Sequence, residues 1–366
     1  MVLKYSFILL MICTGLFSSE KPIDVIAFGS CANQNKEQPS WKSISKHKPD
    51  LMIMLGDNVY ADVDDSWIKQ ANENKRTTEL ELKVTKHIQT QYRKLSNNKD
   101  FMQLRTNTPF IATWDDHDFG KNDMGKEFPF KAISKDIFLN FWEEDKTSPR
   151  KSQDDGIYAS YYYGEMGKKV QVILLDSRYM RDSQFLVDKA NEIQRAKNNR
   201  GPYLANPDPM IRMLGDKQWK WLENELEKPA DLRIIGCSIQ FLSDFTGWES
   251  WSNFPKERER LVKLIEQKKS EHVVFISGDT HWSEFSKLDE NVPYPLWELT
   301  SSGINMEWRE VSPNRNRVGE PYYKSNFGLI LIDWENNPTV TMQIRNEDNT
   351  LIMEKKIELS TLTFKQ

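Results

Sequence analysis

Short apolar runs alternate with longer amphipathic segments through most of the chain. Runs bounded by polar or turn-forming residues predict buried strands at 24–29, 51–55, 110–113, 170–175, 232–237 and 272–277. Apolar residues spaced three or four apart predict helices at 41–48, 79–96, 132–143, 216–227 and 256–268. Because strands that alternate with helices pair in parallel through crossover connections, this pattern predicts an α/β fold.

The pattern changes toward the C-terminus, where strands follow one another without helices between them. They are predicted at 296–300, 328–334, 339–345 and 352–359, with a hairpin turn at 336–338. A β-rich part that packs on an α/β part predicts two sheets face to face with helices outside. We expect one continuous domain over residues 22–360, since no internal repeat or linker interrupts it. The polar segment 181–213 is expected to cross the surface and cover the site.

The N-terminus has a different character from the rest. Lys4 precedes the apolar run 7–17, and Ser18 and Ser19 follow it, which is the layout of a secretory signal peptide over residues 1–20. No later run approaches the roughly 18 apolar residues of a membrane helix, so we expect no transmembrane helix in the mature chain. The protein is therefore expected to be exported, to the periplasm or the cell exterior. Lipoprotein anchoring through Cys13 is the minority alternative.

Composition narrows the classes of function. Hydrophobic residues make up 38% of the 366-residue chain, and 12 Trp are among them, so a sizeable core is expected. The net charge of −4 combines 50 basic with 54 acidic residues, which excludes nucleic-acid binding by bulk charge. After signal removal only Cys31 and Cys237 remain of the three cysteines. They either form a disulfide or leave Cys31 as a thiolate for another purpose.

Polar groups suited to metal binding follow several of the predicted strands. They are Cys31, Asp57, Asp116 with His117, and Asp279 with His281. Ligands of open sheets gather beyond the carboxyl ends of parallel strands, so these groups are expected to meet at one edge. Each alone has an ordinary alternative, because Gly-Asp forms turns and acidic loops cap helices. Asn122 and Asp123 likewise either bind a further cation or cap a helix, and we assign no role to Trp248, Trp251 and Trp282.

Longer blocks carry a family resemblance. The blocks are GSC (29–31), GDNVYAD (56–62), TWDDHDFGKND (113–123), LDSRYMR (175–181), WESWSNFPKERERL (248–261) and SGDTHWSEF (277–285). Together they resemble the PhoD-like alkaline phosphatase family, which is related to purple acid phosphatases within the calcineurin-like metallophosphatases. The resemblance implies a metallophosphatase-type sandwich of two mixed β-sheets flanked by helices, with metal ions at one edge.

The resemblance also implies a set of ligands. Cys31, Asp57, Tyr60 and Asp279 would bind Fe³⁺, and Asp57 would bridge to a second metal held by Asp116 and His281. The wider superfamily supplies a further His from the strand at 233–241, where this chain has none and offers Ser238 or Gln240. Oxygen donors favour Ca²⁺ at the second site, while Zn²⁺ or Mn²⁺ remain alternatives.

The implied activity is hydrolysis of small-molecule phosphate monoesters by a hydroxide that bridges the metals. His117 would protonate the leaving oxygen, with Asp118 orienting its ring. Arg178 would either clamp phosphate oxygens or form a structural salt bridge with Asp176. Two rivals stay open: a phosphodiesterase with the same metal centre, and an exported binding protein without catalysis.

Overall fold

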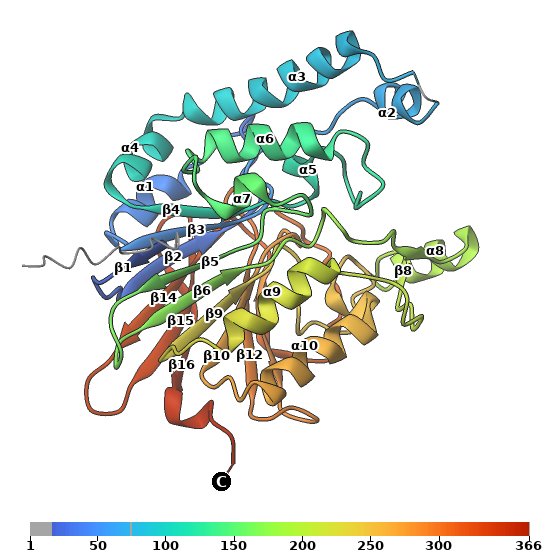
Figure 1. Cartoon of the computed structure of the whole chain (residues 1–366). Helices are drawn as coiled ribbons and strands as arrows, with labels where there is room; N and C mark the ends of the chain where they lie inside the picture. Colours follow the sequence, from blue (N-terminus) through green and yellow to red (C-terminus); the bar gives the residue numbers. More distant parts are fainter. Residues whose placement is uncertain (1–16, 74, 366) are drawn as a thin grey trace, which may run out of the picture.

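Two large β-sheets pack face to face, and helices cover the outer side of each (Figure 1). The computed structural model describes residues 17–73 and 75–365. The eight-stranded sheet has the order β1 (Phe17–Ser19), β5 (Ala159–Tyr163), β6 (Val170–Leu174), β9 (Leu232–Gly236), β10 (Val273–Ser277), β12 (Leu296–Ser301), β11 (Ser283–Leu288) and β13 (Arg317–Tyr322). The six-stranded sheet has the order β16 (Leu351–Glu358), β15 (Thr339–Asn346), β14 (Asn326–Asp333), β2 (Val25–Gly29), β3 (Leu51–Leu55) and β4 (Phe110–Thr113). Both sheets combine parallel and antiparallel pairs.

The helices divide between the two outer faces. Over the six-stranded sheet lie α1 (Ser40–Ser45), α3 (Thr78–Ser96), α4 (Lys99–Asn107) and α6 (Lys131–Phe141), with α2 (Asp65–Asn72), α5 (Asp116–Phe119) and α7 (Pro149–Ser152) nearby. Over the eight-stranded sheet lie α9 (Asp216–Leu226) and α10 (Pro255–Gln267). The excursion carries a small hairpin, β7 (Phe185–Leu186) with β8 (Tyr203–Leu204), and α8 (Lys189–Ala196). Two 3-10 turns, Trp251–Asn253 and Leu359–Thr361, complete the elements.

The alternation of side chains along β3 explains why its run is apolar throughout. Leu51, Ile53 and Leu55 belong to the core that joins the two sheets, whereas Met52 and Met54 pack with residues of the covering helices. Successive side chains of a strand point to opposite faces, so a strand covered on both faces needs apolar residues at every position. The same burial on two sides holds the loops after β2, β3 and β4 at one edge of the sheet.

The expected α/β sandwich of two mixed sheets flanked by helices is confirmed. The predicted strands and helices form within one or two residues of the expected bounds, helix 41–48 excepted, whose helical part ends at Ser45. The pattern missed β1, β5, β7, β8, β11 and β13, together with α2, α4, α5, α7 and α8. The hairpin between β14 and β15 forms as expected, with Asn336 in the left-handed region at φ 53°.

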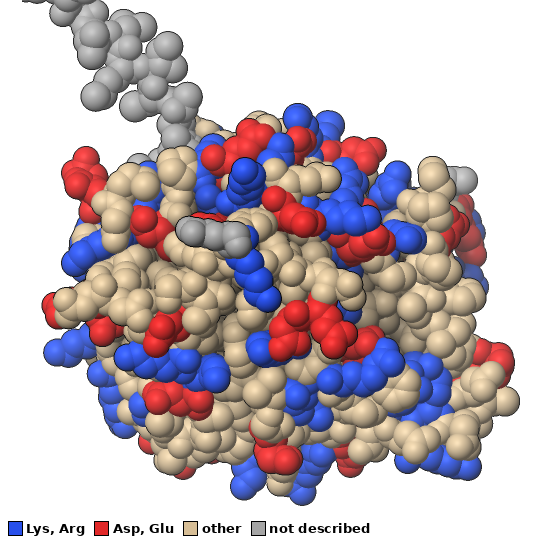
Figure 2. Space-filling view, turned by 90° about the horizontal axis from the view of Figure 1, so that it is seen from below, with Lys and Arg blue, Asp and Glu red and all other residues tan. Residues whose placement is uncertain are grey.

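The expected signal sequence falls almost wholly outside the described residues, and so does Cys13. Its last part, β1, is described and pairs in parallel with β5. Within the described part of the chain, no helix is both long and apolar enough to serve as a membrane span. On the face shown in Figure 2, basic and acidic side chains intermingle.

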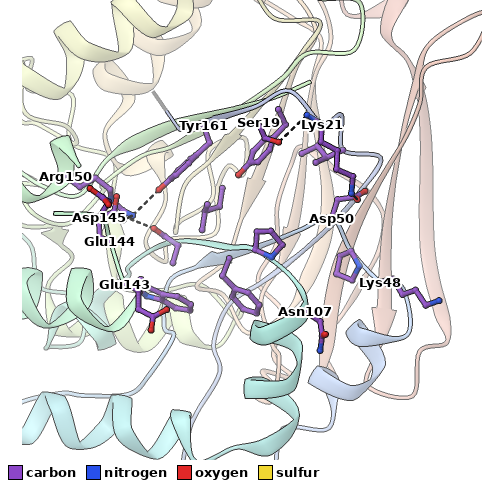
Figure 3. Close-up of a pocket in the computed structure, with 18 residues that line it drawn as sticks. Ser19, Lys21, Lys48, Asp50, Asn107, Glu143, Glu144, Asp145, Arg150 and Tyr161 are labelled. Carbon is purple, nitrogen blue, oxygen red and sulfur yellow. Dashed lines mark hydrogen bonds and ion pairs between the residues drawn. The ribbon is translucent and has the colours of Figure 1, made fainter. Parts of the chain in front are cut away.

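A large hollow lies beside edge strand β4, toward the amino ends of β3 and β4 (Figure 3). It has a volume of about 660 Å³. Two ion pairs lie in its wall. Arg150 donates to Glu144 at 2.9 Å and to the Tyr161 hydroxyl at 3.1 Å, and Lys21 donates to Asp50 at 3.0 Å. This hollow is at the opposite end of the strands from the groups that the sequence singled out.

Candidate metal centre

The loops that follow β2, β3, β4 and β10 converge at the carboxyl ends of these strands. Ligand atoms of Cys31, Asp57 and His281 lie within 4.8 Å of one another, and so do those of Asp57, Asp116 and His117. A further group within the same distance combines Asp115, Asp116 and Asp279. The Tyr60 hydroxyl lies 3.0 Å from His281 Nε2. The fold therefore brings together all the residues that we expected to bind metal.

The backbone of this edge is held in an unusual conformation. Cys31, Asp57, Asp279 and His281 have φ of 58°, 48°, 73° and 60°. Non-glycine residues adopt this left-handed region rarely, and such strain gathers at functional sites. Gly56 just before Asp57 has φ 93°, and a Cβ there would lie 2.4 Å from that of Asp115. Glycine is thus required where the loops after β3 and β4 approach each other.

Cys31 lies at the buried end of the centre as a free thiol. Its Sγ is 3.5 Å from Asp57 Oδ2 and 3.2 Å from Ser302 Oγ. The alternative disulfide does not form, because Cys31 and Cys237 are both free. Cys237 instead accepts a hydrogen bond from Trp251 Nε1 at 3.2 Å.

Backbone N–H groups orient the carboxylates of the opposite side. The N–H of His117 donates to Asp116 Oδ1 at 2.9 Å and to Asp57 Oδ1 at 3.3 Å. Asp123 donates its N–H to Asp116 Oδ2 at 2.7 Å. Ligand atoms of Asp116, Asp123 and Glu249 form another cluster within 4.8 Å. These contacts fix the carboxylates before any cation arrives.

Two buried acids of the centre, Asp57 and Asp279, lack enough positive partners, whereas His117 and Arg178 outweigh burial at Asp116 and lower its pKa. Burial raises the pKa of Cys31 to about 12 and raises the pKa values of Asp57 and Asp279 well above the ordinary range, with added repulsion from neighbouring acids. Asp115 Oδ2 is buried, and no hydrogen-bond partner for it exists among the described residues. Burial also lowers the pKa of His281 to about 4, which keeps its imidazole neutral. Crowded acids, a thiol and a neutral imidazole are a donor set that fits metal cations.

His117 is oriented by Asp62, which we had not singled out. Its Nδ1 lies 2.5 Å from Asp62 Oδ2, while the other oxygen of Asp62 accepts the N–H of Asn122 at 2.7 Å. Burial alone would lower the pKa of His117, but the carboxylates of Asp116 and Asp57 raise it to about 11. The expected role of Asp118 is wrong, because its carboxylate instead accepts N–H groups from Asn58 and Asp115.

Arg178 lies behind the centre, away from the pocket wall. It is fully buried, and its guanidinium reaches Asp115 Oδ1 at 2.5 Å and Glu249 Oε2 at 2.6 Å. The salt bridge with Asp176 that we considered does not form; Asp176 Oδ1 accepts the backbone N–H of Arg178 at 2.9 Å. This placement does not favour a direct clamp on phosphate, and it suits a role in holding the two acids in position.

Ser238 and Gln240 do not occupy the place of a metal ligand. Ser238 donates to Asp115 Oδ1 at 2.7 Å, and Gln240 donates to Glu284 at 2.8 Å. Both side chains are fully buried. These two side chains instead hold the carboxylates of Asp115 and Glu284 in position.

A small pocket opens onto the centre, with a volume of about 160 Å³. Its wall consists of Asp57, Asp116, His117, Asn122, Asp123, Trp248, Glu249, Asp279, Thr280, His281, Trp282 and Trp308. Trp248 and Trp282, left without a role above, thus lie at the pocket, whereas Trp251 is buried in the core. Sequence reasoning missed Asp62, Glu249 and Trp308. The first two stand inside the motif blocks, which was a usable signal, but Trp308 lies outside every block.

Comparisons with known proteins agree with this geometry. Residues 26–350 match the sequence profile of the PhoD-like phosphatases. Alkaline phosphatase D of Bacillus subtilis (strain 168) is 25% identical over 304 residues, which cover 77% of this chain and 49% of that protein. This chain therefore spans about half the length of that curated relative.

Two solved structures share the fold. One described as the structure of PhoD has a TM-score of 0.63 at 19% identity, over 93% of this chain and 72% of that one. GAP50, described as the anchor in the inner membrane complex of Plasmodium, has a TM-score of 0.52 at 12% identity, over 94% of this chain and 90% of that one.

Proposed function

Since this chain belongs to the PhoD-like phosphatase family, we propose that it is an exported, metal-dependent phosphatase that hydrolyses phosphate monoesters of small molecules. One observation carries the proposal: buried acids, a thiol and imidazoles, without enough cationic partners, converge where several strands end. A binding protein that had lost catalysis would have no need to keep this strained, charged edge.

The donor set suggests which residues hold which ion. Cys31, Asp57, Tyr60 and Asp279 would hold Fe³⁺, while Asp116 and His281, with Asp57 shared, would hold a second ion, for which Ca²⁺ is proposed and Zn²⁺ or Mn²⁺ are alternatives. When bound, these ions would supply Lewis-acid chemistry to phosphoryl oxygens and water.

The chain's own groups would complete the reaction. Asp62 occupies Nδ1 of His117, so Nε2 is the nitrogen left to give a proton to the leaving oxygen. Arg178 would act as a positioning residue, because from behind the centre it fixes Asp115 and the pocket-wall residue Glu249. The pocket is small, which suits a phosphoryl group with the rest of the ester outside.

Elemental mass spectrometry of mature protein, purified from an exporting host without chelators, tests the metal assignment. We expect about one iron per chain together with calcium, and release of phosphate from aryl monoesters. Two zinc or manganese ions without iron would retain the hydrolase and reject the ferric site. Metal-free protein without hydrolysis would return us to the binding-protein alternative.

Colour supplies an independent test of Tyr60. A tyrosine bound to Fe³⁺ gives a visible charge-transfer band, so the iron-loaded protein should be coloured and Tyr60→Phe should bleach it. Tyr158→Phe is the matched control, since Tyr158 donates to Asp155 away from the centre. A colourless, active, iron-loaded wild type would remove Tyr60 from the ligand set.

A phosphodiesterase is the second candidate, favoured by a groove that continues from the pocket past Trp248 and Trp308. This groove offers space for a second esterified group. Parallel assays with aryl monoesters and aryl diesters would separate the two activities.

A further inference from the structure

The groove beside the pocket has a defined wall on each side. Its volume is about 350 Å³, and it shares Trp248 and Trp308 with the candidate metal pocket. The other lining residues are Glu192, Ala196, Asn199, Arg200, Pro202 and Glu310. The two cavities therefore adjoin at these two rings, and a group bonded to a phosphate in the pocket would lie next to the groove.

Trp308 presents a fixed aromatic surface to the groove. It is 40% exposed, although its ring is among the largest apolar groups of the chain. Its backbone N–H donates to the carbonyl of His281 at 3.1 Å, and its indole N–H donates to the carbonyl of Glu310 at 3.1 Å. Trp248 packs against it edge to face, with ring centroids 5.9 Å apart. An exposed ring held by its own hydrogen bonds is suited to contact a ligand, and the bond to His281 sets its position relative to the centre.

The opposite wall of the groove belongs to the excursion 181–213, and backbone hydrogen bonds join it to the segment just before Trp248. The N–H of Gly201 donates to the carbonyl of Thr246 at 3.1 Å, and that of Tyr203 donates to Gly247 at 2.9 Å. A Cβ at Gly201 would lie 2.3 Å from the oxygen of Gly247, so only glycine allows this approach. The hydroxyl of Tyr203 donates to Asp123, which lines the metal pocket. The excursion therefore forms one wall of the groove, whereas none of its residues is among those that line the metal pocket it was expected to cover.

The polar groups of the groove define the chemistry that fits it. Glu192 and Glu310 offer oxygen acceptors, Asn199 offers both a donor and an acceptor, and Arg200 offers donors. Hydroxyl groups need both kinds of partner, while the C–H face of a saturated ring packs against an indole. Glu192 is already paired with Lys189 at 2.9 Å, and the remaining charges of the lining, Glu310 and Arg200, balance each other. The groove therefore has no excess charge that would select a charged group over a neutral one.

We propose that the groove binds the alcohol portion of the substrate, and that this portion is a neutral polyhydroxylated ring, as in a sugar phosphate or the ribose of a nucleotide. The proposal rests on the phosphatase function proposed above. Trp308 is then a specificity-determining residue, since binding energy from this remote part of the substrate adds to that of the phosphoryl group.

Kinetics with matched esters test the proposal. Trp308→Ala should lower kcat/KM for glucose 1-phosphate about tenfold, mainly through KM, because it removes a contact made equally before and during reaction. Hydrolysis of glycerol 1-phosphate, which has no ring, should fall by a smaller factor, because it loses only the contact that Trp308 makes at the wall of the metal pocket. Trp308→Phe should restore most of the loss. Trp334→Ala, at the turn between β14 and β15, is the control for loss of a partly buried indole at the other end of the strands.

The possible outcomes distinguish binding of the ring in the groove from the phosphatase activity itself. Equal losses on both esters, or no loss on either, would overturn the groove as a subsite. Adenosine 5′-monophosphate in parallel distinguishes a ribose from a hexose as the ring. Saturation-transfer NMR with methyl glucoside gives a readout without turnover: its ring protons should receive saturation from wild type and not from Trp308→Ala. If the wild type hydrolyses no ester, the phosphatase proposal fails, and this NMR experiment still decides the groove.

Discussion

The cavities at the two ends of the strands differ both in volume and in how well their buried charges are paired. The hollow at the amino ends of β3 and β4 is about 660 Å³ in volume, yet its buried Arg150 is matched by Glu144, Tyr161 and the carbonyls of Ala112 and Ile157. The pocket at the carboxyl ends is about 160 Å³, and burial strongly raises the pKa values of Asp57 and Asp279 in its wall. Uncompensated charge, rather than volume, marks the end of the strands at which we propose the function, because buried charge without partners is costly unless a ligand relieves it.

The largest expected effect separates the two ends by activity. Asp57→Asn removes the carboxylate shared by the proposed ions, and we expect kcat/KM to fall by at least about 10³-fold with loss of bound metal. Asp50→Asn, the matched change at the hollow, should leave both quantities unchanged. Phosphate release and elemental analysis of the two variants measure this. Retention of wild-type metal and turnover by Asp57→Asn would remove the site as drawn.

Stability should show the opposite preference. Arg150→Met leaves the buried Glu144 without its cation, and we expect a loss of about 3 kcal/mol in the free energy of unfolding. Turnover per folded, metal-loaded molecule should not change, because Arg150 is far from the pocket. Urea unfolding measures the loss, and Arg150→Met combined with Glu144→Gln should recover part of it. A stable but inactive Arg150→Met would contradict the division between the two ends.

A substitution at Asp62 tests whether His117 acts as a general acid whose ring Asp62 orients. Asp62→Asn should lower kcat about 10- to 100-fold with little change in KM, as expected for loss of a partner that orients a catalytic imidazole. The deficit should be smallest on esters with good leaving groups, as it should be for His117→Asn. A purely structural loss would lower all esters equally, so leaving-group dependence is the decisive measurement.

The sequence predicted where the candidate ligands would lie because each follows a buried strand at a fixed place. Leu51–Leu55 is apolar at every position, so the position of Asp57 at its carboxyl end follows from the pattern. The hydrogen-bond and ion-pair partners of these groups could not be predicted from the pattern. Asp62 meets His117 across 55 positions of chain, and Arg178 meets Asp115 across 63. Such pairs depend on how the loops close over one another.

The missed strands have a similar cause. β11 contains the buried polar residues Ser283, Glu284 and Ser286, which do not look like a strand of a core. Glu284 is accepted there because Gln240, Asn314 and Arg317 all donate to it. Partners from distant segments, rather than local periodicity, therefore decide that this stretch is a strand.

The ion-free protein offers a finer comparison between the two ends. Burial raises the folded-state pKa of Asp279, so its contribution to stability is present below the unfolded pKa and is lost as the pH rises. Asp279→Asn should therefore stabilise the chelated protein by about 1 kcal/mol at pH 7, with no gain near pH 4. Thermal unfolding with and without added metal measures this, and the variant should lose the stabilisation that metal gives wild type. A destabilised, chelated Asp279→Asn would mean that the acid is compensated within the chain.

Asp50 should behave in the reverse sense, with the smallest effect. Burial works against its charged form, but the N–H groups of Asp24 and Val25 and the Lys21 ammonium outweigh it and lower its pKa. Its contribution is then present above the unfolded pKa and is lost as the pH falls through the folded pKa. Asp50→Asn should cost less than about 1 kcal/mol at pH 7, since Asp50 is partly exposed, and nothing in strong acid. Opposite signs for Asp50→Asn and Asp279→Asn at pH 7 would establish that only one end of the strands is built around missing positive charge; equal signs would refute that contrast.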